Sequence, residues 1–235
     1  MDWFSRASSP IAWTVQPEML MIEASQPLTV LTSAIYGSNQ LRTKRIINRH
    51  VDKSYAANEP EKEIRDWLIQ KNIPRQETVV LLTAARVDQV SSRFVEEETF
   101  KLAVFITAGV GNAARAGEQY PVFLKDRKFT PHTINTVVLV DGLMTKPAMV
   151  NAVITATEAK AAALQDLKVK DACGNIATGT TTDAILIAST QDGTRNYQHA
   201  YAGLSSPLGS AVGKAVYQAV KEAVLTERKR EEHTT

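Results

Sequence analysis

The chain has 235 residues, of which 44% are hydrophobic and 22% are charged, as is ordinary for a globular protein. Its 27 lysines and arginines nearly balance 25 aspartates and glutamates, so its charge argues against nucleic acid or an anionic membrane as a partner. Cys173 is the only cysteine, which excludes an internal disulfide and a two-cysteine metal motif and favours a reducing, cytoplasmic location.

The chain opens with short apolar runs separated by Gln-Pro pairs. Because proline cannot donate to a strand ladder and favours turns, Ile11–Val15, Met19–Glu23 and Leu28–Thr32 predict consecutive antiparallel strands with hairpin-like connections. Residues 1–27 are thus expected to form N-terminal strands with an extension. The basic cluster in Arg42–Arg49 is expected to be a solvated helix face, with an anion contact as the alternative.

Two segments in the first two thirds of the chain have helical spacing. Glu61–Lys71 carries apolar residues at helical intervals and must end before Pro74. Met144–Leu167 is rich in alanine. In that segment Thr145 is a suitable N-cap, and Pro147 lies in the first turn, where its missing N–H does no harm.

The C-terminal region predicts one more long helix. From Leu208 to about Glu227, apolar residues follow a single helical stripe. The mixed-charge run Glu227–Glu232 is expected to be the solvated end of this helix, and residues 228–235 a solvated tail.

Apolar runs rich in β-branched residues predict further strands at Thr78–Leu82, Phe100–Thr107, Ile134–Val140 and Ala184–Ser189. The strands come in groups and do not alternate strictly with helices. This grouping favours an α+β fold with a largely antiparallel or mixed sheet over a doubly wound parallel sheet. Two long alanine-rich helices are expected to pack on the sheet, with layered α/β/β/α packing as one arrangement, in a single domain over residues 1–235.

Three predicted strands run into, or emerge from, stretches of threonine, glycine and alanine. These stretches are Thr83–Ala85, Thr107–Gly117 and Ala177–Asp183. Glycine exposes backbone N–H groups and admits a close ligand, while hydroxyls add donors without bulk. If the three ends share one edge of the sheet, they form a pocket lined by donors; otherwise they are turns and caps.

The run Gly109–Ala114 matches the G-x-G-x-x-A pattern of dinucleotide-binding proteins. That pattern requires an amphipathic helix directly after it, whereas Gly117–Pro121 predicts a turn. The sequence also contains no G-x-x-x-x-G-K-[ST] phosphate loop and no G-x-S-x-G nucleophile elbow. A nucleotide site of the Rossmann type is therefore disfavoured.

The alanine-rich helix places two charged residues on different faces. Lys160 falls on the apolar stripe, and Glu158 lies nearly opposite. A lysine on an apolar face either extends its ammonium to solvent or supplies a partly desolvated charge to a site. His50 and His132 are each a structural residue or a general base, and no His-Glu-x-x-His spacing predicts a zinc site.

Several motifs taken together resemble the adenosylcobinamide amidohydrolase family, in order and in spacing. The resemblance spans roughly Leu31 to Val224. The matching segments are Thr32-Ser33-Ala34, Thr107-Ala108-Gly109, Asn112, Arg115-Ala116-Gly117, Thr133-Ile134-Asn135, Thr155–Lys160, Ala177–Thr180, Thr182-Asp183 and Gly203 to Gly209. Three positions differ from the family pattern: His132-Thr133 stands in place of Gly-Thr, the imidazole of His50 comes one residue later after Asn48, and Gly203–Ser206 lacks a histidine expected there.

The resemblance implies a reaction and a substrate. Members of the family hydrolyse the amide that links the aminopropanol arm to the corrin ring of adenosylcobinamide, giving adenosylcobyric acid and 1-aminopropan-2-ol in cobalamin (vitamin B12) salvage. Cobalt belongs to this corrinoid substrate, and no cofactor held by protein ligands is expected. The alternative is a non-catalytic corrinoid- or nucleotide-binding protein, and in either case a homo-oligomer stays open.

Amide hydrolysis requires a nucleophile, a site for the oxyanion and a proton for the leaving amine. Either Glu158 or Asp183 activates water, or a hydroxyl such as that of Thr180 attacks directly. Lys160 is expected to stabilise charge or donate a proton. The residues expected to bind substrate are Asn48, His50, Thr107, Gly109, Asn112, Arg115, Asn135, Thr178, Gly179 and Thr182.

Overall fold

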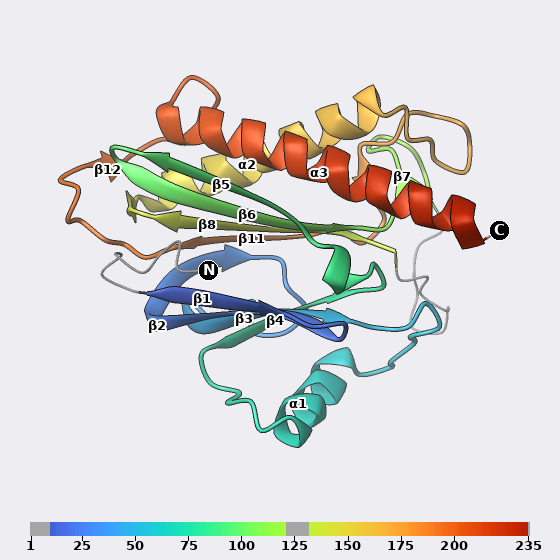
Figure 1. Ribbon diagram of the computed structural model, residues 1–235, viewed down its shortest axis with the longest axis horizontal. Helices are drawn as coiled ribbons and strands as arrows, with labels where there is room; N and C mark the ends of the chain where they lie inside the picture. The colour runs from blue at the N-terminus through green and yellow to red at the C-terminus, as the bar shows by residue number, and fades with distance from the viewer. Residues whose placement is uncertain (1–9, 121–131, 235) are drawn as a thin grey trace.

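The computed structural model describes residues 10–120 and 132–234 (Figure 1). The strands are β1 (Ile11–Val15), β2 (Met19–Thr32), β3 (Arg42–His50), β4 (Thr78–Thr83), β5 (Ser91–Glu97), β6 (Phe100–Ala108), β7 (Ala113–Ala114), β8 (Ile134–Asp141), β9 (Leu143–Met144), β10 (Gly179–Thr180), β11 (Ala184–Ser189) and β12 (Gln198–His199). The helices are α1 (Pro60–Gln70), α2 (Lys146–Asp166) and α3 (Pro207–Thr234), with a 3-10 turn η1 at Val87–Gln89.

The elements form four layers (Figure 1). Helices α2 and α3 cover β5, β6, β8 and β11, a second layer of strands holds β1 to β4, and α1 covers the far side of that layer. Within the described residues, eight strands belong to one hydrogen-bonded sheet with the order β4-β3-β2-β11-β8-β6-β5, and β1 pairs with β2. Most pairs are antiparallel, whereas β3/β4 and β8/β11 are parallel. The predicted α+β class with a mixed, layered sheet is confirmed.

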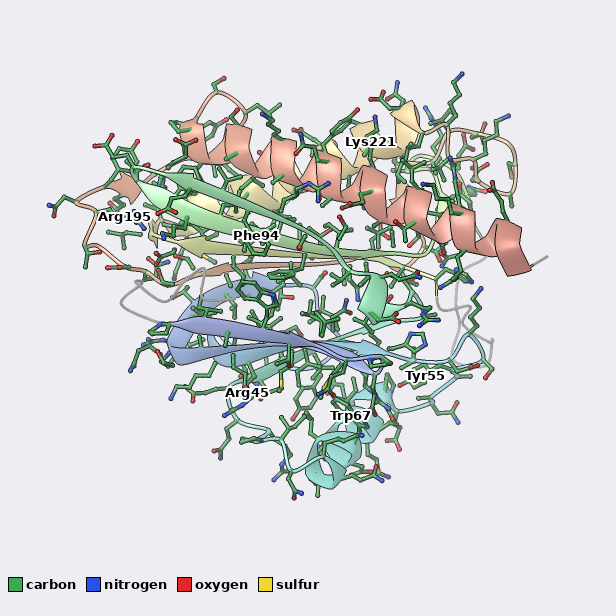
Figure 2. All side chains as sticks on the ribbon, in the orientation of Figure 1. Arg45, Tyr55, Trp67, Phe94, Arg195 and Lys221 are labelled. Carbon is green, nitrogen blue, oxygen red and sulfur yellow. The ribbon has the colours of Figure 1, made fainter. Side chains whose placement is uncertain are left out.

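Side chains between the two strand layers form the central core. Trp13 of β1 stacks on Phe94 of β5, with ring centroids 5.3 Å apart, and both rings contact Phe105 of β6. Figure 2 shows Phe94 pointing into this space between the layers. Because β6, β8 and β11 are covered on both faces, they are continuous apolar runs and lack the alternation of a half-exposed strand.

Strand β2 connects the two layers, which corrects one prediction. Met19–Glu23 and Leu28–Thr32 were expected to be separate strands, but they form one strand whose register with β3 shifts between Glu23 and Leu28. Gln26-Pro27 lies in that irregular stretch, where a residue without an N–H is tolerated. The first half of β2 pairs with β3, and the last residues of β2 pair with β11. The sheet therefore passes from one layer to the other along β2.

The basic cluster in Arg42–Arg49 was expected to lie on a helix, and this prediction was wrong. The segment is strand β3. Successive side chains of a strand point to opposite faces, so Ile46 is buried in one core and Ile47 in another core on the other face. The charges sit at partly exposed positions, where Arg45 pairs with Glu23. Strand β5 was also not predicted, because its polar residues leave it half exposed.

The three predicted helices are present. Thr145 caps α2 by accepting from the Ala148 N–H at 3.2 Å, as expected. Helix α1 ends at Gln70, and Asn72 follows in the left-handed region that asparagine tolerates at helix ends. In the part of the chain that the structure describes, no helix is long and apolar enough to cross a membrane.

Candidate active site

In the described part of the chain, the ends of five strands meet at one edge of the molecule, which we call the polar edge. Strands β3, β4 and β6 end there, and β8 and β11 begin there. In Figure 1 this edge lies beside β7 and the C-terminal end of α3, away from β12. The register pairs that close it are His50 with Thr83, Ala108 with Ile134, and Ala184 with Asn135.

The two longest glycine- and threonine-rich segments of the sequence pair with each other at the polar edge. They supply β7 and β10, which form a two-stranded antiparallel ribbon with Gly179 opposite Ala114. Side chains hold the same two segments together. Their bonds run from Asn112 Nδ2 to Thr181 Oγ1 (2.7 Å), from the Ala116 N–H to Thr178 Oγ1 (2.9 Å) and from Arg115 Nη1 to the Ile176 carbonyl (3.0 Å).

Asp183, between this ribbon and β11, accepts hydrogen bonds from four donors. Its Oδ1 accepts from the backbone N–H of Ile134 at 3.0 Å and from Thr180 Oγ1 at 2.5 Å. Its Oδ2 accepts from the backbone N–H of Thr180 at 3.1 Å and from Lys160 Nζ. The carboxylate therefore joins α2, β8 and the threonine-rich loop at one point.

Lys160 and Asp183 form a largely buried ion pair, with side chains 12% and 17% exposed. The ammonium reaches this position because Gly179 has no side chain: a Cβ there would lie 2.9 Å from Lys160 Nζ and would also collide with the Asp183 carboxylate. Of the two interpretations open for Lys160, the structure supports a partly desolvated charge beside the threonine-rich loop. Ion pairs this far out of water are held in fixed geometry more firmly than surface pairs.

A buried polar network joins the two strand layers below the polar edge. Asn48 of β3 donates to Thr107 Oγ1 of β6 at 2.8 Å, and Asn135 of β8 donates to Asn48 Oδ1 at 2.7 Å and to the Leu82 carbonyl at 2.9 Å. Thr133 donates to the Thr182 carbonyl at 2.7 Å, which connects the network to the loop of Asp183. Asn48, Thr107 and Asn135 are each at least 98% buried. Their hydrogen bonds therefore fix the position of one strand layer against the other.

Glu227 of α3 is a component of the polar edge that the sequence analysis did not identify. It was expected to begin the solvated end of the last helix, but it is 5% exposed and accepts a hydrogen bond from the Val110 N–H at 3.0 Å. Its Oε1 lies 4.0 Å from Nδ1 of His132, whose ring fills the space that a Cβ on Gly111 would occupy. The signal was available: Glu227 follows Val224 by three residues and so continues the buried stripe of α3.

The remaining candidates at this edge bind backbone groups. Thr182 Oγ1 donates to the His132 carbonyl at 2.7 Å, and the Gly109 N–H donates to the Thr133 carbonyl at 3.0 Å. His50 Nδ1 lies 3.0 Å from the Ala85 carbonyl and is partly exposed. These contacts position the loops of the polar edge.

Arg115 lies at the outer side of the ribbon, next to a tyrosine–aspartate pair. Its backbone N–H donates to the Tyr120 hydroxyl at 2.7 Å, and that hydroxyl donates to Asp171 Oδ2 at 2.6 Å. This side-chain hydrogen bond raises the pKa of Tyr120 and lowers the pKa of Asp171. The backbone N–H and the guanidinium of Arg115 thus both make contacts within the protein.

Glu158, one of the two carboxylates expected to activate water, is not brought into this cluster. It is exposed on α2, whereas Lys160 faces the sheet. Side chains two positions apart on an α-helix point in directions that differ by about 200°, so Glu158 and Lys160 cannot both face one site. Asp183 is the carboxylate that the fold places beside Lys160.

Comparison with models of known protein families shows which family the chain belongs to. A model of the adenosylcobinamide amidohydrolase family matches residues 6–232. The chain belongs to this family. The match includes every motif segment that meets at the polar edge, and membership places the chain among amidohydrolases.

Two related proteins and one solved structure are also similar to this chain. The chain is 30% identical over 178 residues to an adenosylcobinamide amidohydrolase of Methanosarcina mazei, covering 72% of this chain and 76% of that protein. It is 29% identical over 143 residues to an uncharacterized protein of Methanocaldococcus jannaschii, covering 54% of this chain and 56% of that one. A crystal structure of a protein from Pyrococcus horikoshii covers 93% of this chain and 79% of its own, with a TM-score of 0.50 and 12% identity, which shows a shared fold alone.

Proposed function

We propose that this protein hydrolyses the amide between the aminopropanol arm and the corrin ring of adenosylcobinamide, giving adenosylcobyric acid and 1-aminopropan-2-ol. The observation that carries the proposal is the convergence of Lys160, Asp183 and Thr180 at the polar edge of a chain that belongs to this amidohydrolase family. The cobalt ion is part of the substrate.

The contacts of Asp183 favour attack by the Thr180 hydroxyl over attack by water. Thr180 Oγ1 already donates to the carboxylate at 2.5 Å, so the acceptor of its proton is in place. In the first step the Thr180 oxygen bonds to the amide carbon while its proton passes to Asp183. Lys160, on the other carboxylate oxygen, supplies positive charge near the oxyanion that forms.

The second half of the reaction restores the enzyme. The carbon–nitrogen bond breaks, the nitrogen takes the proton from Asp183, and neutral 1-aminopropan-2-ol leaves. Water then attacks the ester on Thr180, adds its oxygen to the acyl carbon and returns one proton to the threonine oxygen. The products are the corrinoid carboxylic acid and the free amine, and atoms and charge balance.

The function is tested by incubating the purified protein with adenosylcobinamide and measuring free 1-aminopropan-2-ol and the corrinoid acid by mass spectrometry. The proposal expects both products in equal amounts. Tight binding of the corrinoid without release of the amine would instead support a non-catalytic corrinoid-binding protein.

The route is tested with two substitutions of the proposed nucleophile. Thr180→Ala should lower kcat by roughly a thousandfold or more, whereas Thr180→Ser, which keeps the hydroxyl, should retain a measurable fraction of it. An acid quench should trap a corrinoid ester on the peptide that contains Thr180. Turnover by Thr180→Ala at the wild-type rate would reject the hydroxyl route and leave water as the nucleophile.

A further inference from the structure

A small cavity lies beside the Lys160–Asp183 pair, between α2 and the first residues of β8 and β11. Its volume is about 160 Å³. It is lined by Ile134, Thr136, Ala156, Thr157, Lys160, Asp183, Ala184 and Ile185. Two strands and one long helix supply its walls.

The volume limits what can enter. Pockets that hold a whole drug-sized ligand have volumes of roughly 300 to 1,000 Å³. A cavity of 160 Å³ is about half of that lower limit, so it can take one short arm of a large substrate while the macrocycle stays outside.

The lining combines two kinds of surface. Four lining residues are apolar, namely Ile134, Ala156, Ala184 and Ile185, and the other four are the two threonines and the ion pair. A short amine that carries one methyl and one hydroxyl group matches this mixed lining, because the methyl group can contact the apolar residues and the hydroxyl group the polar ones.

The position of Asp183 gives the direction in which an amide would lie. Its Oδ1 contacts Thr180, the proposed nucleophile, and its Oδ2 contacts Lys160, which lines the cavity. An amide whose carbonyl carbon lies at Thr180 therefore directs its nitrogen, and the arm beyond it, across Asp183 toward the cavity.

We propose that this cavity is the subsite for the amine arm of the substrate, a short hydroxyalkylamine, with the corrin ring held outside it. This inference rests on the proposed function. It assigns Thr157, which is exposed on α2 at the cavity wall, to the recognition of the leaving amine rather than of the corrin ring.

The test separates the arm from the ring by comparing a substrate that carries the arm with a product that lacks it. Thr157→Trp should fill the cavity wall and lower kcat/KM for adenosylcobinamide by about tenfold or more. The inhibition constant of adenosylcobyric acid, which has no arm, should change by less than about threefold. Val150→Trp is the matched control, because Val150 is 50% exposed on the same face of α2, about two turns earlier, and does not line the cavity.

Each outcome decides the inference. A loss of substrate turnover in Thr157→Trp, with unchanged binding of the acid and a normal Val150→Trp protein, supports the arm subsite. Unchanged turnover in Thr157→Trp, or an equal loss of acid binding, overturns it. The proposed function fails separately, if the wild-type protein releases no 1-aminopropan-2-ol from adenosylcobinamide.

Discussion

Lys160 and Asp183, 23 residues apart in the sequence, form an ion pair directly against the backbone of Gly179. The pair joins helix α2 to the threonine-rich loop before β11. It depends on three separate features: a lysine on the apolar stripe of α2, a carboxylate at the start of a buried strand, and a glycine that leaves room for both.

A methyl group on Gly179 should disturb this pair more than it disturbs the fold. Gly179 does not require a left-handed backbone, so the effect of Gly179→Ala is steric. We expect kcat/KM for amide release to fall by about a hundredfold, because misplacing a reacting group by about 1 Å has an effect of this size. Steady-state kinetics measure it, and urea denaturation should show a loss of less than about 2 kcal/mol.

Gly193→Ala is the control for this substitution. A Cβ at Gly193 meets nothing within 4 Å, and its backbone is not left-handed. Its kinetics and stability should match the wild type. If both alanine variants behave alike, the close contact between Gly179 and the ion pair has no bearing on activity.

The buried network of Asn48 and Asn135 should contribute to stability. Asn135→Leu removes the donor to the buried Asn48 Oδ1 and to the partly buried Leu82 carbonyl. Each buried group left without a partner costs about 1–3 kcal/mol, so we expect a loss of at least about 2 kcal/mol in the free energy of unfolding.

Chemical denaturation of the two single variants, the double variant and a control variant tests this claim. Asn58→Leu, at an exposed loop position, should leave the midpoint nearly unchanged. The double variant Asn48→Leu/Asn135→Leu should lose less than the sum of the two single variants, because the two side chains share a hydrogen bond. Strict additivity would mean that the network does not act as a unit.

The segments that form this site could be predicted from the sequence, but their meeting at one edge of the sheet could not. The threonine and glycine stretches that end Phe100–Thr107 and precede Ala184–Ser189 were identified from composition. That they pair as β7 and β10 depends on the register between β6 and β8, which is a long-range property. The family resemblance supplied the order of the motifs and so anticipated that they act together.

Two predictions failed because they rested on the charged residues of a segment: Arg42–Arg49 was taken as a solvated helix face, and Glu227 as the start of a solvated helix end. Strand β3 carries four basic residues yet buries Ile46 and Ile47 on opposite faces, because long side chains at its other positions reach solvent or carboxylates. Glu227 lies in a charged run, yet helical periodicity turns it inward, where the Val110 N–H satisfies its carboxylate. Helical periodicity was the better guide at Glu227, and the adjacent buried isoleucines were the better guide in β3.

Stability should depend on pH through His199 of β12. Burial lowers the pKa of His199 below its ordinary value of 6.5, despite its contact with the Thr99 carbonyl at 3.2 Å. Below pH 6.5 the unfolded chain therefore binds more protons than the folded chain, so this contribution to stability is present above pH 6.5 and is lost as the pH falls through the lowered pKa.

Urea midpoints measured from pH 7.5 down to pH 5, compared with those of His199→Gln, isolate this effect. The glutamine variant keeps a donor near the Thr99 carbonyl but does not titrate. The wild type should lose stability more steeply toward acid than the variant does. Parallel curves would show that His199 does not contribute to the pH dependence.

The most direct test of the account is the initial rate of 1-aminopropan-2-ol release from adenosylcobinamide by wild-type protein and by Asp183→Asn. The amide keeps the shape of the carboxylate but cannot take the proton of Thr180 Oγ1 or balance the charge of Lys160. We expect release by the wild type and a rate lower by roughly a thousandfold or more in the variant, with the fold of both verified by circular dichroism. Absence of release by the wild type, or an undiminished rate in Asp183→Asn, would contradict the account.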